Sequence, residues 1–226
     1  MKQVVIKKGQ PLVVEVASPV AMEGFLLVEV RASCVSPGTE MAGIVNSGKS
    51  LLKRVLEQPD KGKAALGQMV EHGIGAVWRR AKEKFDREGL CGYSAAGVVV
   101  DVGRGVEGMR PGMRVAVAGA GMANHAEVVA VPVNLAMVMP EGLGFDEASS
   151  VALGGIALQG IRRAEVVLGE RVAVIGCGPL GLLAVQMLRA AGCRVLATDL
   201  DEGRLEMAKA MGAEVILHPS LTATID

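Results

Sequence analysis

The chain has 226 residues, of which half are apolar and 21% are charged, and glycine occurs 30 times. This composition is typical of a folded globular chain with a large core, and it excludes intrinsic disorder. Lys plus Arg and Asp plus Glu each total 24, so the net charge is zero. Without an overall basic field, we expect neither nucleic acid nor a membrane surface as a partner.

The N-terminal segment and the cysteines indicate a cytoplasmic protein. Residues 1–16 alternate in polarity and contain an acid, so they lack the apolar stretch of a signal peptide. No apolar run approaches the roughly 18 residues of a membrane span. The four cysteines, Cys34, Cys91, Cys177 and Cys193, have no paired spacing, and no local zinc motif such as CxxC occurs. We expect buried free thiols in a reducing compartment.

The front of the chain is predicted to be rich in β-strands. Over residues 2–35, short β-branched runs separated by Pro and Gly predict an antiparallel meander. Further strands are expected at residues 97–102, 114–117 and 126–131, with glycine-rich turns between them. Together these segments predict a compact, partly open β-barrel over residues 1–145. A helical stretch is expected at residues 145–163, where it leads into a new unit.

A helical insert is expected within this barrel, at residues 50–88. Its apolar residues recur at helical spacing and predict two or three helices. The insert has a basic excess with acids interleaved, which favours a solvated outer face over a partner surface.

The strongest motif follows in the second part of the chain. Residues 171–175 form a short apolar run typical of a buried parallel strand, and Gly176-Cys177-Gly178-Pro179-Leu180-Gly181 comes directly after it. Apolar residues at helical spacing lead to Gly192, and a second strand at residues 193–198 ends in Asp199. Strand, glycines, helix, strand and acid in this order predict a dinucleotide-binding turn rather than a glycine turn without a ligand.

Each residue of the turn has a mechanical reason. Gly176 permits the tight turn, Gly178 lets the backbone approach a pyrophosphate, and Gly181 lets the helix lie close to its strand. Pro179 suits the first helical turn, where no N–H partner is needed. With Leu180 it opens a helix whose free amides and positive dipole end would face the phosphates.

The acid after the second strand favours NAD over NADP. Asp199 would accept hydrogen bonds from the adenosine ribose, and its charge would repel a 2′-phosphate. Arg204, close in sequence, weakens this preference slightly. Asp201 is expected to cap a second helix that ends at Gly212, with a third strand at residues 214–217.

A barrel-like front followed by this βαβ unit resembles the medium-chain dehydrogenase/reductase superfamily, the relatives of alcohol dehydrogenase. The matching stretches stand at residues 34–36, 92–99, 112–115 and 125–128. Ser36-Pro37-Gly38-Thr39-Glu40 before the insert, and Leu90-Cys91-Gly92-Tyr93-Ser94 after it, are similar to the bi-domain oxidoreductase branch. The resemblance implies α/β plus β architecture: a GroES-like domain at residues 1–145, then a partial Rossmann NAD-binding domain, a doubly wound parallel sheet, at residues 146–226.

The resemblance also locates the family's zinc ligands, normally Cys, His and Cys or an acid. Cys34 stands at the first position, but Tyr93 stands at the second, and residues 151–156 offer no ligand at the third. We therefore predict no metal and zinc independence. A substitute set of Cys34, Cys91 and His72 has no support in its spacing.

Without zinc, hydrogen-bond donors must stabilise charge on the substrate oxygen. The phenol of Tyr93 is the candidate proton donor, although filling the space of a ligand explains it equally well. Ser36 and Thr39 are candidates to orient the nicotinamide or relay the proton. His125 stands where the family usually has an aromatic, so we expect a packing or surface role for it.

Two functions of different classes remain. The favoured one is a zinc-independent NAD(H)-linked oxidoreductase that acts on a small alcohol, carbonyl or activated C=C substrate, and the resemblance suggests a sugar-related one. The alternative is a non-catalytic nucleotide-binding or interaction module. A doubly wound sheet needs about six strands, and the sequence predicts only three. We therefore expect a truncated or partial chain, or one completed by another polypeptide. The partners that we consider are this completing polypeptide or further copies of the chain in a homo-oligomer.

Overall fold

The computed structural model describes residues 1–7, 9–40 and 89–218. The chain divides into two compact units, Met1–Ser150 and Val151–Asp226, each of which is described by itself. The helical insert expected at residues 50–88 and the histidine at position 72 lie outside the described residues.

The first unit begins with a small antiparallel sheet. Strands β1 (Lys2–Lys7) and β2 (Gln10–Glu15) form a hairpin, and β4 (Gly89–Leu90) pairs with the other edge of β1. The order of this sheet is therefore β2-β1-β4. It brings the residues that follow position 88 back beside the N-terminus.

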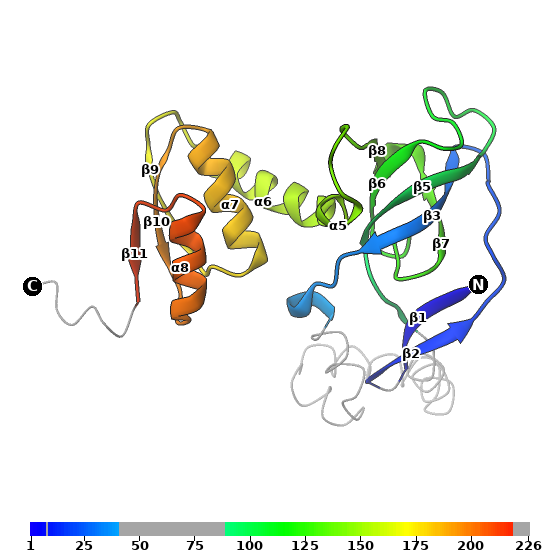
Figure 1. Ribbon diagram of the computed structural model, residues 1–226, viewed down its shortest axis with the longest axis horizontal. Helices are drawn as coiled ribbons and strands as arrows, with labels where there is room; N and C mark the ends of the chain where they lie inside the picture. Colours follow the sequence, from blue (N-terminus) through cyan, green and yellow to red (C-terminus); the bar gives the residue numbers. More distant parts are fainter. Residues whose placement is uncertain (8, 41–88, 219–226) are drawn as a thin grey trace, which may run out of the picture. The chain divides into compact units, whose positions relative to one another are not determined.

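A curled five-stranded antiparallel sheet makes up the rest of this unit. Its order is β7-β3-β5-β6-β8, and a 3-10 helix, η1, joins β7 to β8 (Figure 1). The elements are β3 (Phe25–Ser33), β5 (Ser94–Val102), β6 (Arg114–Ala118), β7 (Val128–Pro132), η1 (Val133–Leu135) and β8 (Ala136–Val138). The partly open barrel is confirmed.

The predicted meander over residues 2–35 is wrong, because β3 does not pair with β2. Instead β3 lies between β5 and β7, which come much later in the chain. Burial explains the choice: Leu26 and Val28, two positions apart on one face of β3, are fully buried against Val99 and Val115. An isolated hairpin could not have buried this face.

The helical stretch expected at residues 145–163 is two helices. Helix α5 (Phe145–Ala148) ends the first unit, and α6 (Val151–Arg163) begins the second. At the break, the hydroxyl of Ser149 donates to the Asp146 carbonyl and that of Ser150 to the Glu147 carbonyl, both at 2.7 Å. Such local side-chain bonds compete with helical ones and explain the interruption.

The second unit contains the predicted βαβ arrangement. Its parallel sheet has the order β11-β10-β9, with α7 after β9 and α8 after β10 (Figure 1). The elements are β9 (Arg171–Ile175), α7 (Pro179–Ala190), β10 (Arg194–Thr198), α8 (Glu202–Ala210) and β11 (Val215–Leu217). As predicted, Asp201 caps α8, and its carboxylate accepts the Arg204 amide at 3.0 Å.

The core of this unit lies between the sheet and α7 and α8. Val185 and Leu188 of α7 pack against Val195 of β10, and Leu205 of α8 joins them. All four cysteines of the chain are free thiols, and all but Cys34 are buried. Among the described residues, no helix has the length and hydropathy to cross a membrane.

Candidate functional site

The turn between β9 and α7 has the geometry that its glycines predict. Gly176 has φ +91°, in the left-handed region where a side chain is strained, and its N–H donates to the Thr198 carbonyl at 2.7 Å. A Cβ on Gly181 would lie 1.9 Å from the Gly176 carbonyl oxygen. The helix therefore starts in close contact with the turn, and only glycine fits there.

Gly178, by contrast, faces open space. A Cβ on this residue would meet no atom within 4 Å. Pro179 is the first residue of α7, and the amides of Leu180 and Gly181 have no intrahelical acceptor because they lie in the first turn. Free amides, a positive dipole end and an uncovered backbone together suit a diphosphate, so this turn fits the dinucleotide that the sequence predicts.

Asp199 lies against this turn. Its Oδ2 accepts the Cys177 amide at 2.6 Å and its Oδ1 accepts the Asp201 amide at 2.9 Å. Two hydrogen bonds lower the pKa of the Asp199 carboxyl below its usual value: the bond from the Cys177 amide has the larger effect, and the bond from the Asp201 amide the smaller one. The positive charge of Arg204 adds a weaker effect in the same direction. The carboxylate is therefore ionised, and with four lone-pair sites it can still accept ribose hydroxyls. Sequence reasoning missed its second role, which is to tie the end of β10 to the glycine turn.

Arg204 is half exposed beside this acid. Its Nη1 lies 3.9 Å from Asp199 Oδ2, and its Nε lies 3.9 Å from Asp201 Oδ2. The guanidinium therefore partly offsets the negative charge where the sequence analysis expects repulsion of a 2′-phosphate. It can also reach a phosphate there, because its side chain is 52% exposed.

Two of the predicted catalytic residues in the first unit lie together. Residues 37–40 form a helical turn after β3, with Ser36 before it and Pro37 as its first residue. The Ser36 hydroxyl lies 3.5 Å from the Thr39 hydroxyl. The Ser36 amide donates to Glu40 Oε1 at 3.0 Å, and the Glu40 amide donates to the Ser36 carbonyl at 2.9 Å. This turn therefore fixes the Glu40 carboxylate as well as the two hydroxyls.

Tyr93 is not joined to those hydroxyls. It lies between Cys91 and the start of β5, half-buried, and its carbonyl accepts the Gly119 amide at 2.9 Å. In the described part of the chain, its phenol makes no hydrogen bond to Ser36 or Thr39. The predicted proton relay through these three residues is therefore not assembled by direct contacts.

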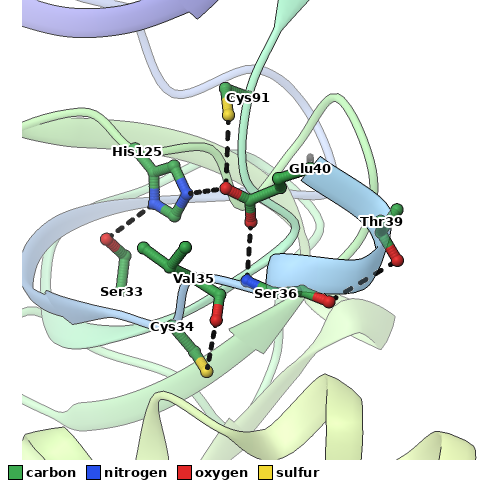
Figure 2. Close-up of polar contacts among 8 residues, drawn as sticks. All are labelled: Ser33, Cys34, Val35, Ser36, Thr39, Glu40, Cys91 and His125. Atoms are coloured by element: carbon green, nitrogen blue, oxygen red, sulfur yellow. Dashed lines mark hydrogen bonds and ion pairs between the residues drawn. The ribbon is translucent and has the colours of Figure 1, made fainter. Parts of the chain in front are cut away.

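A buried polar cluster of Glu40, Cys91 and His125 lies beside the Ser36 turn (Figure 2). Glu40 Oε2 lies 3.2 Å from His125 Nε2 and accepts the Cys91 thiol at 3.4 Å. The side chains of His125 and Glu40 are 10% and 11% exposed. His125 Nδ1 lies 2.8 Å from the Ser33 hydroxyl. The expected packing or surface role for His125 missed these polar contacts.

Electrostatics keep the thiol of this cluster protonated. Burial first, and then the Glu40 carboxylate, raise the pKa of Cys91 to about 11. Sequence reasoning missed the cluster because its residues are separated by 51 and 34 positions, and only the strand pairing brings them together. The one indication of the cluster in the sequence was Glu40, the acid at the end of the Ser-Pro-Gly-Thr-Glu turn.

Among the described residues of this unit, the side chains that could hold a metal ion gather in the cluster and not at the family's ligand positions. The Cys34 thiol donates to the Val35 carbonyl at 3.8 Å and lies outside the cluster (Figure 2). Tyr93 stands at the next family position. These positions do not fit a zinc ion. Glu40, Cys91 and His125 instead offer a carboxylate, a sulfur and an imidazole within 4.8 Å of one another, and among the described residues no other such group of three exists.

Comparisons with known proteins agree with the fold. A family model described as "Zinc-binding dehydrogenase" matches residues 179–226. The (R,R)-butanediol dehydrogenase of Bacillus subtilis (strain 168) is 32% identical over 156 residues, which cover 58% of this chain and 44% of that protein. The chain thus spans about half the length of the curated relatives it matches.

Solved structures show the same architecture over nearly the whole chain. An alcohol dehydrogenase superfamily protein from Novosphingobium aromaticivorans has a TM-score of 0.71 and 25% identity, covering 97% of this chain and 59% of that one. The Escherichia coli quinone oxidoreductase, solved in complex with NADPH, has a TM-score of 0.72 at 17% identity, covering 99% and 60%. At this low identity the second likeness concerns the fold alone.

Proposed function

Because the chain belongs to the medium-chain dehydrogenase/reductase superfamily, we propose that it is an oxidoreductase which transfers a hydride between NAD(H) and an alcohol or carbonyl substrate. The observation that carries the proposal is the β9–α7 turn. Gly181 is packed against Gly176, whereas the space beside Gly178 is open, and the Cys177 amide holds the Asp199 carboxylate against the turn.

The chain's own residues bind and orient the dinucleotide. When bound, the nicotinamide would supply the hydride chemistry. The amides of Leu180 and Gly181 would donate to the diphosphate, and the ionised Asp199 would accept from the ribose hydroxyls. Repulsion between Asp199 and a 2′-phosphate supports NAD as the preferred cofactor, and the exposed guanidinium of Arg204 reduces that preference without reversing it.

We assign Tyr93 as the proton donor to the substrate oxygen, with Ser36 and Thr39 as orienting hydroxyls. Loss of a general acid costs about 10²- to 10⁴-fold in rate, so Tyr93→Phe should lower kcat by this factor. NADH affinity should stay unchanged, since we assign the Tyr93 phenol to the substrate oxygen and not to the dinucleotide. A Tyr93→Phe variant with normal turnover would show that the phenol only fills space.

The absence of a metal and zinc independence stay predictions, and the argument for them concerns only the family's ligand positions. It rests on Tyr93 at a position where the family has a ligand, and on the lack of ligands at residues 151–156. Turnover that Cys34→Ala leaves intact would support it, and turnover lost in that variant would contradict it. The Glu40–Cys91–His125 cluster is a different donor set, which the argument for that prediction did not take into account.

The substrate that we propose is a small polyol or sugar-related alcohol. Support comes from the similarity to proteins named (R,R)-butanediol dehydrogenase and sorbitol dehydrogenase, both 32% identical over their matched segments. Small molecules of this kind need hydroxyl-binding groups, and the Ser36 and Thr39 hydroxyls are candidates.

The test begins with a fluorescence titration that measures the binding of NADH to the full chain. Saturable binding that Gly178→Ala weakens would support the dinucleotide site, and no saturable signal would refute it. In the second step, the protein is incubated with vicinal diols or polyols and NAD+, or with aldehydes or enones and NADH. Hydride transfer is measured by the change in NADH absorbance. Binding without hydride transfer to any substrate would refute the enzyme and support the non-catalytic nucleotide-binding module instead.

A further inference from the structure

We propose that Glu40, Cys91 and His125 bind a zinc ion, at a site distinct from the family's ligand positions. The inference is independent of the dinucleotide site, which lies in the other unit. It starts from three donor atoms that face one another: Oε2 of Glu40, Sγ of Cys91 and Nε2 of His125 (Figure 2).

The spacing of these atoms suits a tetrahedral ion. With the usual Zn–O, Zn–N and Zn–S bond lengths, neighbouring ligand atoms of a tetrahedron lie about 3.4–3.6 Å apart. Oε2 of Glu40 lies 3.2 Å from Nε2 of His125 and 3.4 Å from Sγ of Cys91. Two edges of the tetrahedron are therefore already close to their final length.

The side chains of Glu40 and His125 each have a second polar partner on the side that faces away from the cluster. The Ser36 amide donates to Oε1 of Glu40 at 3.0 Å, which leaves Oε2 directed at the cluster. The Ser33 hydroxyl lies 2.8 Å from Nδ1 of His125, which leaves Nε2 directed at the same point. Metal-binding histidines and carboxylates are usually oriented in this way by a second partner.

Backbone contacts hold Cys91 and His125 next to each other. The His125 amide donates to the Cys91 carbonyl at 2.8 Å, and the His125 carbonyl accepts the Val4 amide at 2.8 Å. Gly92, with φ +92°, passes so close to His125 that a Cβ would lie 2.7 Å from its backbone nitrogen. Cys91 and His125 are therefore held side by side by the main chain rather than by flexible side chains.

The donor types select the ion. A thiolate with an imidazole and a carboxylate suits zinc, whereas Mg²⁺ and Ca²⁺ require oxygen ligands. Binding would release the thiol proton to solvent and leave Sγ, Nε2 and Oε2 as ligands. Three protein ligands leave a fourth position open to water or a substrate oxygen, as in catalytic zinc sites.

The first experiment measures zinc in the purified full chain by mass spectrometry after dialysis against metal-free buffer. We expect about one zinc per chain. Protein depleted with a chelator and given one equivalent of zinc should recover this content, and its thermal midpoint should rise. Depleted protein that fails to take up zinc would overturn the proposal.

The second experiment assigns the ligands with cobalt. Co²⁺ bound to the depleted protein should give a sulfur-to-metal charge-transfer band, which Cys91→Ala abolishes. Cys34→Ala is the matched control, because Cys34 is a free thiol at the family's first ligand position but outside the cluster. A band that survives Cys91→Ala, or that Cys34→Ala removes, would overturn the assignment.

A milder variant tests the site where Cys91→Ala fails to fold. Ser33→Ala leaves all three ligands in place and removes only the partner of His125 Nδ1. It should weaken zinc binding roughly 10- to 100-fold, measured by competition with a chromophoric chelator. Unchanged affinity would contradict the site. NADH titration of the same samples keeps the two proposals apart, because loss of zinc should leave NADH affinity unchanged.

Discussion

Two glycines of the same turn should respond in opposite ways to alanine. In Gly181→Ala the new Cβ would lie 1.9 Å from the Gly176 carbonyl oxygen and 3.0 Å from its carbonyl carbon. Carbon–oxygen contacts are normally about 3.3–3.6 Å, so helix and turn must separate by more than roughly 1 Å. The neighbouring atoms are backbone and cannot rotate away.

This overpacking should cost about 1–3 kcal/mol. For a chain of this size, it corresponds to a fall of roughly 2–12 °C in the thermal midpoint. Gly178→Ala should leave stability within about 0.5 kcal/mol, since its Cβ meets no atom and its φ of −71° suits alanine. The same Cβ points into the space for the diphosphate and should raise the Kd for NADH at least about tenfold, or about 1.4 kcal/mol.

Circular dichroism on heating and NADH fluorescence titration separate the two effects. Gly155→Ala in α6 is the matched control, because its Cβ also meets no atom and the residue is exposed and outside the turn. It should keep NADH affinity and gain a little stability from the better helix former. A Gly181→Ala protein as stable as the parent, or a Gly178→Ala protein with the parent's NADH affinity, would refute the reasoning.

Three further results are expected. Leu188→Ala should lower the free energy of unfolding in urea by about 2–5 kcal/mol, because the Leu188 side chain is buried, with 2% exposed. Leu168→Ala is the control and should change it by no more than about 0.5 kcal/mol, because Leu168 is 85% exposed. Equal unfolding midpoints for the two variants would contradict the burial of Leu188 in the core. Gly92→Ala should cost about 1–3 kcal/mol through its φ of +92° and its contact with His125, and an unchanged thermal midpoint would count against that geometry. Asp199 has a lowered pKa, so its stabilisation is complete above the usual carboxyl pKa of about 4 and is lost as the pH falls through the lowered value. Asp199→Asn should therefore show a flatter acid-side stability profile than the parent, and parallel profiles would disprove the link.

The segment from β9 to α8 could be predicted because its signals are local. The apolar run, the glycine turn, the helical period and the Asp201 cap all lie within contiguous residues, and each has a short-range physical cause. The helix break at residues 149–150 was missed, although it is also local. There the Ser149 and Ser150 hydroxyls bond to carbonyls three residues back, and the apolar period does not report that competition.

The sequence by itself determined the order of elements from β9 to β11 and the glycine turn between β9 and α7, because each depends on residues a few positions apart. The diphosphate and the NAD that we expect at this turn stay predictions. Only the tertiary structure decided that β3 lies between β5 and β7 instead of beside β2. Only the tertiary structure shows that Glu40, Cys91 and His125 lie close together and that the Asp199 carboxylate accepts a hydrogen bond from the Cys177 amide. Such contacts join distant positions, and burying one face of each strand selects among many pairings that local patterns leave equivalent.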